Sequence, residues 1–182
     1  MDESTKPPYR AYAGVGSRET PPEILEIMRR VGYRLAEQGW TLRSGAAQGA
    51  DSAFEEGCRQ FEGGRMEIYL PWKGFSGRQP GNGNFMVSAD IRPLAEAEAS
   101  WAHPSWRYLK HPSKMLHTRN VCQVLGMDLQ APAKFVLCWT PGGTGKGGTG
   151  LAIRLAHHHK IPVFDLADET SLQRVTLAFG PF

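Results

Sequence analysis

The stretch Thr140-Pro-Gly-Gly-Thr-Gly-Lys-Gly-Gly-Thr-Gly150 decides the fold, because it joins two segments of different character. The apolar run at 133–139 before it is typical of a buried strand, and the pattern at 151–156 after it has helical spacing. A glycine-rich turn between a strand and a helix exposes backbone N–H groups and the positive end of the helix dipole, which favour an anion. We therefore predict a phosphorylated ligand at this turn.

Two familiar phosphate motifs can be tested against this stretch. It is not a P-loop, because Thr140 and Gly147 stand where that motif requires glycine and Ser or Thr. The dinucleotide pattern G-x-G-x-x-G is met between Gly143 and Gly148, with Asp165 about twenty residues further on. Because the run holds six glycines, the alternative is a plain tight turn between strand and helix.

The composition is that of an ordinary globular domain, with 41% hydrophobic and 21% charged residues among 182. We expect a single domain over 1–182. No run of 18 or more apolar residues occurs, and the N-terminus is polar and acidic, unlike a signal peptide. These features predict a cytoplasmic protein without a membrane partner. A net charge of +3 permits nucleic-acid binding but does not require it.

The cysteines and histidines do not predict a metal site or a disulfide. Cys58, Cys122 and Cys138 form no CxxC pair, and we interpret them as reduced core residues. His157-His158-His159 are consecutive, so on a helix they point about 100° apart and cannot hold one ion together. Spaced zinc motifs are absent from the sequence. We predict no metal and no cofactor.

Strands alternate with helices along the chain. Apolar runs predict strands at 10–16, 40–43, 66–70, 133–139 and 161–165. Helical spacing predicts a helix from Pro21-Pro22 to a stop at Gly39, with a capping box of Thr20 and Glu23. Further helices are expected at 50–61, 91–99, 113–125, from the glycine-rich stretch to about 159, and at 168–178. The alternation predicts an α/β fold, Rossmann-like and doubly wound around a mainly parallel sheet.

Two segments stand outside this alternation. Residues 1–8 are expected to be a flexible tail, and residues 71–90 are the least regular part of the chain. We expect 71–112 to form an insertion or a lid, because long loops in compact domains are often functional or mobile.

Three turns rich in small residues should meet at one edge of the sheet. In doubly wound sheets, ligands bind beyond the carboxyl ends of the strands where the strand order reverses. With the order 3-2-1-4-5, this rule brings 14–18 next to 141–150, with 44–51 alongside. Glycines let a ligand approach the backbone, and Arg18 can form a bidentate charge-assisted hydrogen bond. Asp51 either favours the dipole of its helix or accepts from a ribose hydroxyl and orients Arg18.

Four segments of the chain resemble the SLOG superfamily. They are VGSR at 15–18, SGAAQGAD at 44–51, LHTRN at 116–120 and PGGTG at 141–145. The superfamily includes DprA-type DNA-processing proteins, LOG-type phosphoribohydrolases and sensors of nucleotide-derived signals. The first two segments are most similar to the short DprA-like proteins of phages and prophages. The resemblance spans about 10–166 without the insertion, and it implies a Rossmann-like fold with a nucleotide or nucleic-acid ligand.

The LOG-type enzymes allow a comparison of catalytic residues. Their H-x-R-K segment resembles 117–120, where Arg119 is present and Asn120 replaces lysine. Their PGGxGTxxE segment resembles 141–149, where Thr149 takes the place of the glutamate. Cleavage of an N-glycosidic bond in a nucleoside monophosphate would therefore need another carboxylate. Glu55, which shares a helix face with Asp51, is the first candidate and Glu19 the second, and a solvated helix charge is the alternative for both. Asp51 is a further candidate for the acid or base.

The sequence as a whole predicts a nucleotide-binding protein, with two alternatives. One is hydrolysis by Arg119 with Asp51 or Glu55, and the other is a DprA-like module that binds single-stranded DNA. A homodimer is a further candidate assembly, because related folds often dimerise. Aromatic and basic residues between Trp72 and Lys110 suit single-stranded nucleic acid, a lid over a nucleotide, or core packing. The residues predicted to bind the ligand are Gly14, Gly16, Ser17, Arg18, Ser44, Gly45, Ala46, Gly49, Asp51, Asn120, Pro141, Gly142, Gly143, Thr144, Gly145, Gly148 and Thr149.

Overall fold

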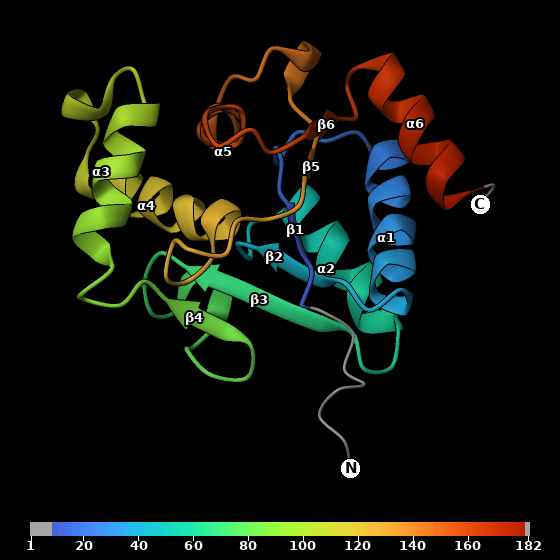
Figure 1. The fold of residues 1–182 in the computed structure, drawn as a ribbon, viewed down its shortest axis with the longest axis horizontal. Coiled ribbons are helices and arrows are strands. Elements are labelled where there is room, and N and C mark those ends of the chain that lie inside the picture. The colour runs from blue at the N-terminus through green and yellow to red at the C-terminus, as the bar shows by residue number, and fades with distance from the viewer. Residues whose placement is uncertain (1–8, 181–182) are drawn as a thin grey trace.

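A six-stranded parallel sheet forms the centre of the computed structural model, which describes residues 9–180 (Figure 1). The strands are β1 (Ala11–Gly14), β2 (Thr41–Ser44), β3 (Arg65–Leu70), β4 (Asn84–Met86), β5 (Val136–Cys138) and β6 (Val163–Asp165). Their order is β4-β3-β2-β1-β5-β6, and every neighbouring pair is parallel. The predicted α/β Rossmann-like class is confirmed, and so is the strand order, to which β4 adds one edge strand.

Helices cover both faces of this sheet (Figure 1). One layer holds α1 (Pro22–Glu37), α2 (Ala50–Gln60) and α6 (Glu169–Phe179), which share one apolar cluster with the sheet. The other layer holds α3 (Arg92–Ala102), α4 (His111–Leu125) and α5 (Gly148–His158), which share a second cluster. Short 3-10 turns lie at η2 (Phe75–Gly77), η3 (Trp106–Tyr108) and η4 (Pro141–Gly143). Burial of apolar surface on both faces is what stabilises such a three-layer arrangement.

The sequence predicts the C-terminal end of α1 correctly but not the capping at its start. The helix ends as predicted, because Gly39 adopts a left-handed φ of 78° that a side chain would disfavour. The predicted capping box at its start is wrong. Pro21 is the N-cap residue and has no side-chain cap, while the Thr20 hydroxyl donates to the carbonyl of Ser17 at 2.7 Å. Thr20 therefore closes the turn after β1 instead of capping the helix.

The segment 71–112 is more regular than the sequence predicts. It contributes β4, which pairs with β3, and α3, which packs against α4 and α5. Ala95, Ala99 and Ala102 of α3 are buried in the core. This segment therefore extends both the sheet and one helical layer. The predicted tail at 1–8 lies outside the described residues.

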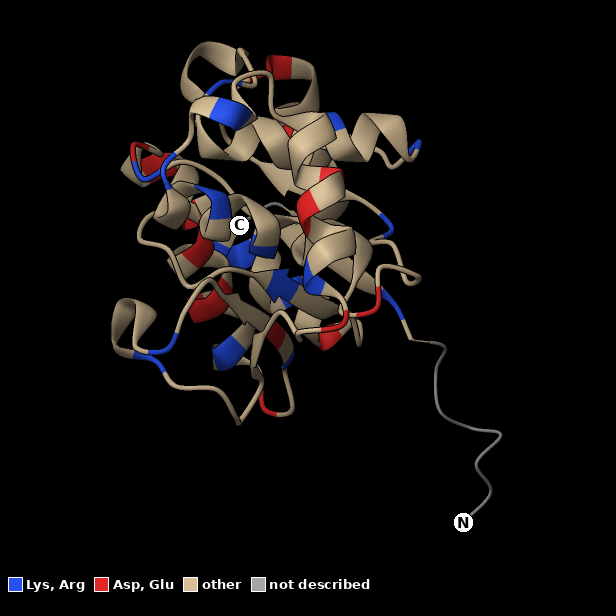
Figure 2. Cartoon of the chain, turned by 90° about the vertical axis from the view of Figure 1, so that its left-hand side faces the viewer, with Lys and Arg blue, Asp and Glu red and all other residues tan. Residues whose placement is uncertain are grey.

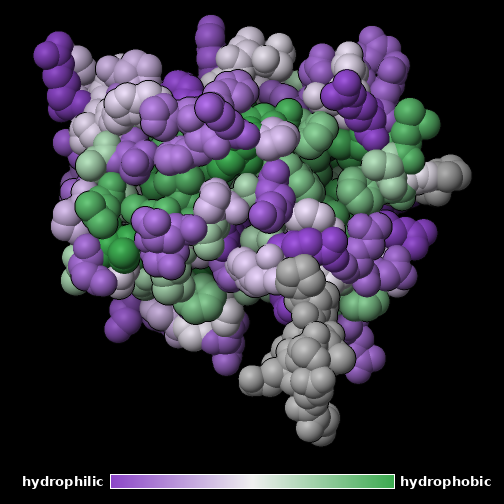
Figure 3. All heavy atoms as spheres, in the orientation of Figure 1, coloured by the Kyte–Doolittle hydropathy of each residue, from purple (hydrophilic) through white to green (hydrophobic). Residues whose placement is uncertain are grey.

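The surface is mixed in character. Acidic and basic residues are interspersed in one side view (Figure 2), and apolar residues in another view form a band interrupted by hydrophilic ones (Figure 3). All three cysteines are free and buried, as predicted. Among residues 9–180, no helix combines the length and the apolar character needed to cross a bilayer.

Candidate functional site

A cavity of about 460 Å³ lies beyond the carboxyl ends of β1 and β5, where the strand order reverses. The turn after β1, the start of α2, one face of α4 and the segment leading into α5 form its walls. The lining residues are Val15, Gly16, Ser17, Arg18, Glu19, Ala47, Asp51, Ser113, Leu116, His117, Arg119, Asn120, Gln123, Pro141, Lys146, Gly147, Gly148, Thr149 and Ala152. The structure thus brings the three small-residue turns together around one pocket.

Close packing of these turns explains several of their glycines. A Cβ on Gly16 would lie 2.6 Å from the Cβ of Ala50, and one on Gly49 would lie 2.6 Å from the carbonyl oxygen of Ser17. The Ser17 N–H donates to the carbonyl of Trp139 at 3.2 Å, which ties the β1 turn to the end of β5. These glycines therefore hold the turns against one another.

Arg119 from α4 is the buried cation of the pocket. Its side chain is 5% exposed, and its Nη1 donates to the carbonyl of Tyr69 at 3.3 Å. The same Nη1 lies 4.0 Å from Oδ2 of Asp51, which is too long for a hydrogen bond. Its Nε has no partner among the described residues. Burial lowers the pKa of Arg119, and the negative charges of Asp51 and Glu55 oppose this effect.

Gln123 connects Arg119 to the neighbouring turn. Its amide is oriented so that the oxygen accepts from the Gly45 N–H at 2.8 Å and from Nη1 of Arg119 at 3.1 Å. The amide nitrogen donates to Oδ1 of Asn120 at 3.2 Å, and Asn120 in turn donates to the carbonyl of Gly148 at 3.4 Å. This chain of contacts joins β2, α4 and the start of α5.

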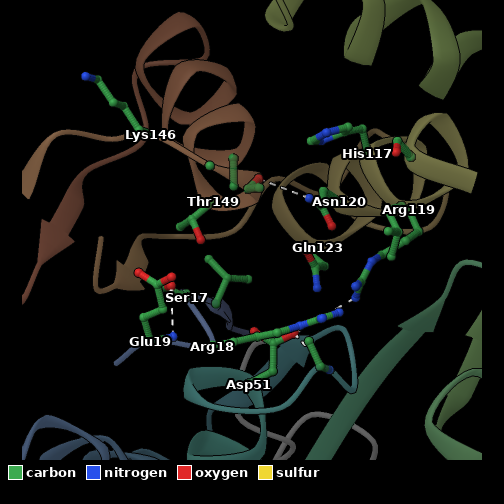
Figure 4. Close-up of a pocket in the computed structure, with 18 of the residues that line it drawn as sticks. Ser17, Arg18, Glu19, Asp51, His117, Arg119, Asn120, Gln123, Lys146 and Thr149 are labelled. Atoms are coloured by element: carbon green, nitrogen blue, oxygen red, sulfur yellow. Dashed lines mark hydrogen bonds and ion pairs between the residues drawn. The ribbon is translucent and has the colours of Figure 1, made fainter. Parts of the chain in front are cut away.

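Asp51 lies in the first turn of α2 and is 3% exposed. Its Oδ2 accepts from the Ala47 N–H at 3.3 Å. Burial raises the pKa of Asp51 to about 6, although Arg119 and backbone N–H groups act in the opposite direction. Asp51 lies at the start of a helix and also lines the pocket, so its position is compatible with both predicted roles, at the helix dipole and at the ligand. The Arg18 side chain extends along the pocket floor toward Arg119 and Asp51 (Figure 4).

Other predicted residues lie outside the lining. Glu55 is fully buried, and its Oε2 accepts from Arg59 and Arg78 at 2.6 Å each. The interpretation of Glu55 as a solvated surface charge is therefore wrong. Ser44 is also buried and donates to the carbonyl of Gly14 at 2.7 Å. The predicted ligand-binding residues that do not line the pocket are Gly14, Ser44, Gly45, Ala46, Gly49, Gly142, Gly143, Thr144 and Gly145.

The glycine-rich stretch is held by Asp165. The Asp165 carboxylate accepts from both the N–H and the hydroxyl of Thr140, and also from the Ala167 N–H at 3.1 Å. Thr140 Oγ1 in turn accepts from the Gly145 N–H at 3.1 Å. Asp165 therefore braces the loop, and the dinucleotide interpretation loses its ribose-binding residue. The parts of the stretch that line the pocket are Pro141 and residues 146–149, the latter at the start of α5.

His117 is a pocket residue that the sequence analysis did not select. It is 9% exposed, its Nδ1 has no partner among the described residues, and its ring centre lies 4.6 Å from that of His103. Burial lowers the pKa of His117 to about 4, so the ring is neutral at pH 7. The sequence contains a pattern that could have identified it. A polar stripe on α4 indicates a side that faces a pocket, and its members at helical spacing are Ser113, His117, Asn120 and Gln123.

The aromatic residues of the insertion divide between packing and surface. Trp72 packs edge-on against Phe75 at 5.3 Å, and Trp106 packs against the core under Lys114. Trp101 and Tyr108 are 59% and 73% exposed. None of these aromatic side chains lines the described pocket.

The comparisons with known proteins include a structural likeness to a solved protein. No family model matches the sequence, and no curated protein matches it significantly. The fold is similar to that of DNA processing protein A from Helicobacter pylori, whose structure was described for its single-stranded DNA binding mode. The TM-score is 0.55 at 18% sequence identity, over 86% of this chain and 64% of that one. At this identity the likeness shows a DprA-like fold, and this chain spans less than two thirds of the other protein.

Proposed function

We propose that the pocket binds a nucleotide through its phosphate, with Arg119 and Arg18 as the cationic contacts. The observation that carries this proposal is the burial of Arg119 without a closely bonded carboxylate. A buried guanidinium is costly unless it is paired, and here the nearest carboxylate oxygen is 4.0 Å away while Nε is unpartnered among the described residues. An anion entering the pocket supplies the missing partner.

The start of α5 supports the same assignment. The first N–H groups of a helix have no intrahelical acceptor and carry the positive end of the dipole. Gly147, Gly148 and Thr149 line the pocket at this helix end. Lys146 lies at the rim, and its side chain points away from Arg119 (Figure 4). The phosphate therefore has backbone donors on one wall and guanidinium groups on the other.

A titration with variants tests the proposal. Nucleoside monophosphates, oligonucleotides and cyclic nucleotides are titrated into the protein, with heat or melting temperature as the readout. Arg119→Met should weaken binding of any ligand by about 100-fold, because a charge-assisted hydrogen bond contributes roughly 1.5–3 kcal/mol. The matched control is Arg174→Met on α6, which does not line the pocket. Equal affinity in Arg119→Met and wild type would disprove the assignment.

A second variant moves Arg119 without removing its charge. A Cβ on Gly45 would lie 1.2 Å from Nη1 of Arg119, so Gly45→Ala must displace the guanidinium. The control is Leu177→Ala on α6, because this side chain is 86% exposed and does not line the pocket. Gly45→Ala should weaken binding and Leu177→Ala should retain it. Circular dichroism of both variants shows whether the fold is kept.

Binding of single-stranded DNA is the second candidate, and the structural likeness favours it. In addition, residues 99–127 contain no Asp or Glu but include Arg107, Lys110 and Lys114. Backbone binding by such cations releases counterions, so gel retention of an oligonucleotide should weaken steeply with salt. Retention that does not change between low and high salt would count against this candidate.

A further inference from the structure

Three charged side chains meet at the floor of the pocket. They are Arg18 from the turn after β1, Arg119 from α4 and Asp51 from α2 (Figure 4). Asp51 and Arg119 are each about 5% exposed, with 4.0 Å between Oδ2 and Nη1. Two guanidinium groups and one carboxylate give this floor a net charge of +1.

Phosphodiesters and phosphomonoesters differ in charge, and a floor with a net charge of +1 should bind them with different affinity. A phosphodiester carries one negative charge at neutral pH, whereas a phosphomonoester carries about 1.5 to 2. A singly charged group balances the floor. A second charge would be placed beside the carboxylate of Asp51, whose side chain is 5% exposed. Like charges at such a partly buried site repel more than on the surface, because water and salt screen them less.

We propose that Asp51 is a specificity-determining residue that makes the pocket prefer a phosphodiester to a phosphomonoester. This inference rests on the proposed function, because it assumes that the phosphate is bound at Arg18 and Arg119. It deepens that function by naming the ligand class, which is a strand-internal or cyclic nucleotide in place of a terminal monophosphate.

Asp51 is held where this discrimination requires it. Its Oδ2 accepts from the Ala47 N–H, and its side chain is only 5% exposed where it lines the pocket. A surface carboxylate would turn into water and lose its effect on the ligand. The pocket wall therefore keeps the negative charge fixed beside the phosphate site.

The charged groups around Asp51 come from three elements. Arg119 faces it from α4, and Glu55 lies on the next turn of α2, where its own arginines neutralise it. Arg18, from the turn after β1, acts on Arg119 and extends toward both side chains (Figure 4). Glu19 and Lys146 lie at the rim of the pocket, and His117 across the pocket is neutral at pH 7 (Figure 4). The local charge at the phosphate position is thus set mainly by Arg18, Arg119 and Asp51.

The test compares matched ligands on the full chain. The four deoxynucleoside 5′-monophosphates and their 5′-methyl phosphodiesters are titrated at pH 8. The diesters should bind about tenfold or more tightly than the monoesters, a ratio that corresponds to ~1.4 kcal/mol. In Asp51→Asn this ratio should fall to one or invert, because the monoester gains affinity while the diester changes little.

Further variants separate charge from structure. Asp51→Ser keeps an oxygen that can accept from the Ala47 N–H, so it serves where Asp51→Asn does not fold. Glu23→Gln removes an exposed carboxylate of α1 that does not line the pocket, and it should leave the ratio unchanged. In wild type the preference should disappear near pH 5, where both Asp51 and the monoester take up protons, while Asp51→Asn should show no diester preference at either pH.

The outcomes are distinct for each proposal. Diester preference that is lost in both Asp51 variants supports the inference. Equal or tighter monoester binding in wild type overturns it and leaves the nucleotide site intact. A preference that survives in the Asp51 variants overturns it as well. Binding of neither ligand, and of no oligonucleotide or cyclic dinucleotide, rejects the proposed function itself. A comparison of oligothymidylate with cyclic dinucleotides then identifies which source of diester is bound.

Discussion

Two carboxylates one turn apart on α2 have opposite surroundings. Glu55 accepts from Arg59 and Arg78 at 2.6 Å each, so its charge is compensated by two close cations. Asp51 has one guanidinium nitrogen at 4.0 Å and faces an open pocket. Burial alone does not distinguish them, because both are nearly inaccessible. The difference lies in how well each charge is paired. On this basis we propose that Glu55 contributes to stability and that Asp51 contributes to ligand binding.

The largest effect should come from removing the paired charge. Glu55→Gln removes the negative charge that compensates Arg59 and Arg78, and it places an amide nitrogen at the buried Oε1 position, which has no partner among the described residues. The free energy of unfolding should therefore fall by about 3 kcal/mol. Urea denaturation at pH 7.5 measures this change. Arg30→Gln on the exposed side of α1 provides a reference for ordinary surface substitutions. A change in Glu55→Gln as small as in that reference would show that the buried cluster contributes little.

The corresponding substitution at Asp51 should have the opposite sign. A carboxyl pKa raised from 3.8 to about 6 means that the folded state binds more protons than the unfolded state between these values. The ionised Asp51 therefore costs stability above pH 6, and that cost disappears as pH falls toward 4. Asp51→Asn should stabilise the protein by ~2 kcal/mol at pH 7.5 and by much less at pH 4.5.

The readout for this prediction is a pair of urea titrations at the two pH values. Stabilisation that is the same at both would point to packing in place of charge. Destabilisation at pH 7.5 would mean that Asp51 is paired as firmly as Glu55, and the contrast between the two carboxylates would fail.

The contrast between these carboxylates also marks the limit of prediction from sequence. Alternating strands and helices are local patterns, so they predict the sheet order and the meeting of the turns that carry Arg18 and Asp51. Arg119 is predicted from the resemblance to LOG-type enzymes. The burial of Glu55 depends on Arg78, which reaches it from a loop 23 residues away. No local pattern encodes that contact.

Tertiary contacts also decided the other differences. The short strand β4, Asn84-Phe-Met86, has too few residues to show an alternating pattern, and it forms only by pairing with β3. Asp165 stands at the spacing expected of a residue that binds a ribose, yet its carboxylate accepts hydrogen bonds from Thr140 instead. Sequence spacing predicts where a side chain lies along the chain, but its hydrogen-bond partners depend on the packed structure.

The smallest effect should come from His117, which faces Asp51 across the pocket and responds to pH in the opposite way. Its pKa is lowered from 6.5 to about 4, so the folded state binds fewer protons than the unfolded state in this interval. Its contribution to stability is present above pH 6.5 and is lost as pH falls toward 4. Acidification should therefore lower the free energy of unfolding of the wild type by about 1 kcal/mol relative to His117→Gln. This value is small because the ring lines an open pocket, where solvent screens its charge.

The effect of His117 can be separated from that of Asp51 because both wild type and His117→Gln retain Asp51. The contribution of Asp51 is the same in both proteins, so it cancels in the difference between their free energies of unfolding. What remains is the contribution of the histidine. Measured at pH 7.5 and pH 5, this difference should change in favour of His117→Gln on acidification. A difference that is constant with pH would place the imidazole in contact with water. Asp51 would then be the buried titrating group of the pocket. The free energy of unfolding of the protein would increase on acidification, with no opposing contribution from His117.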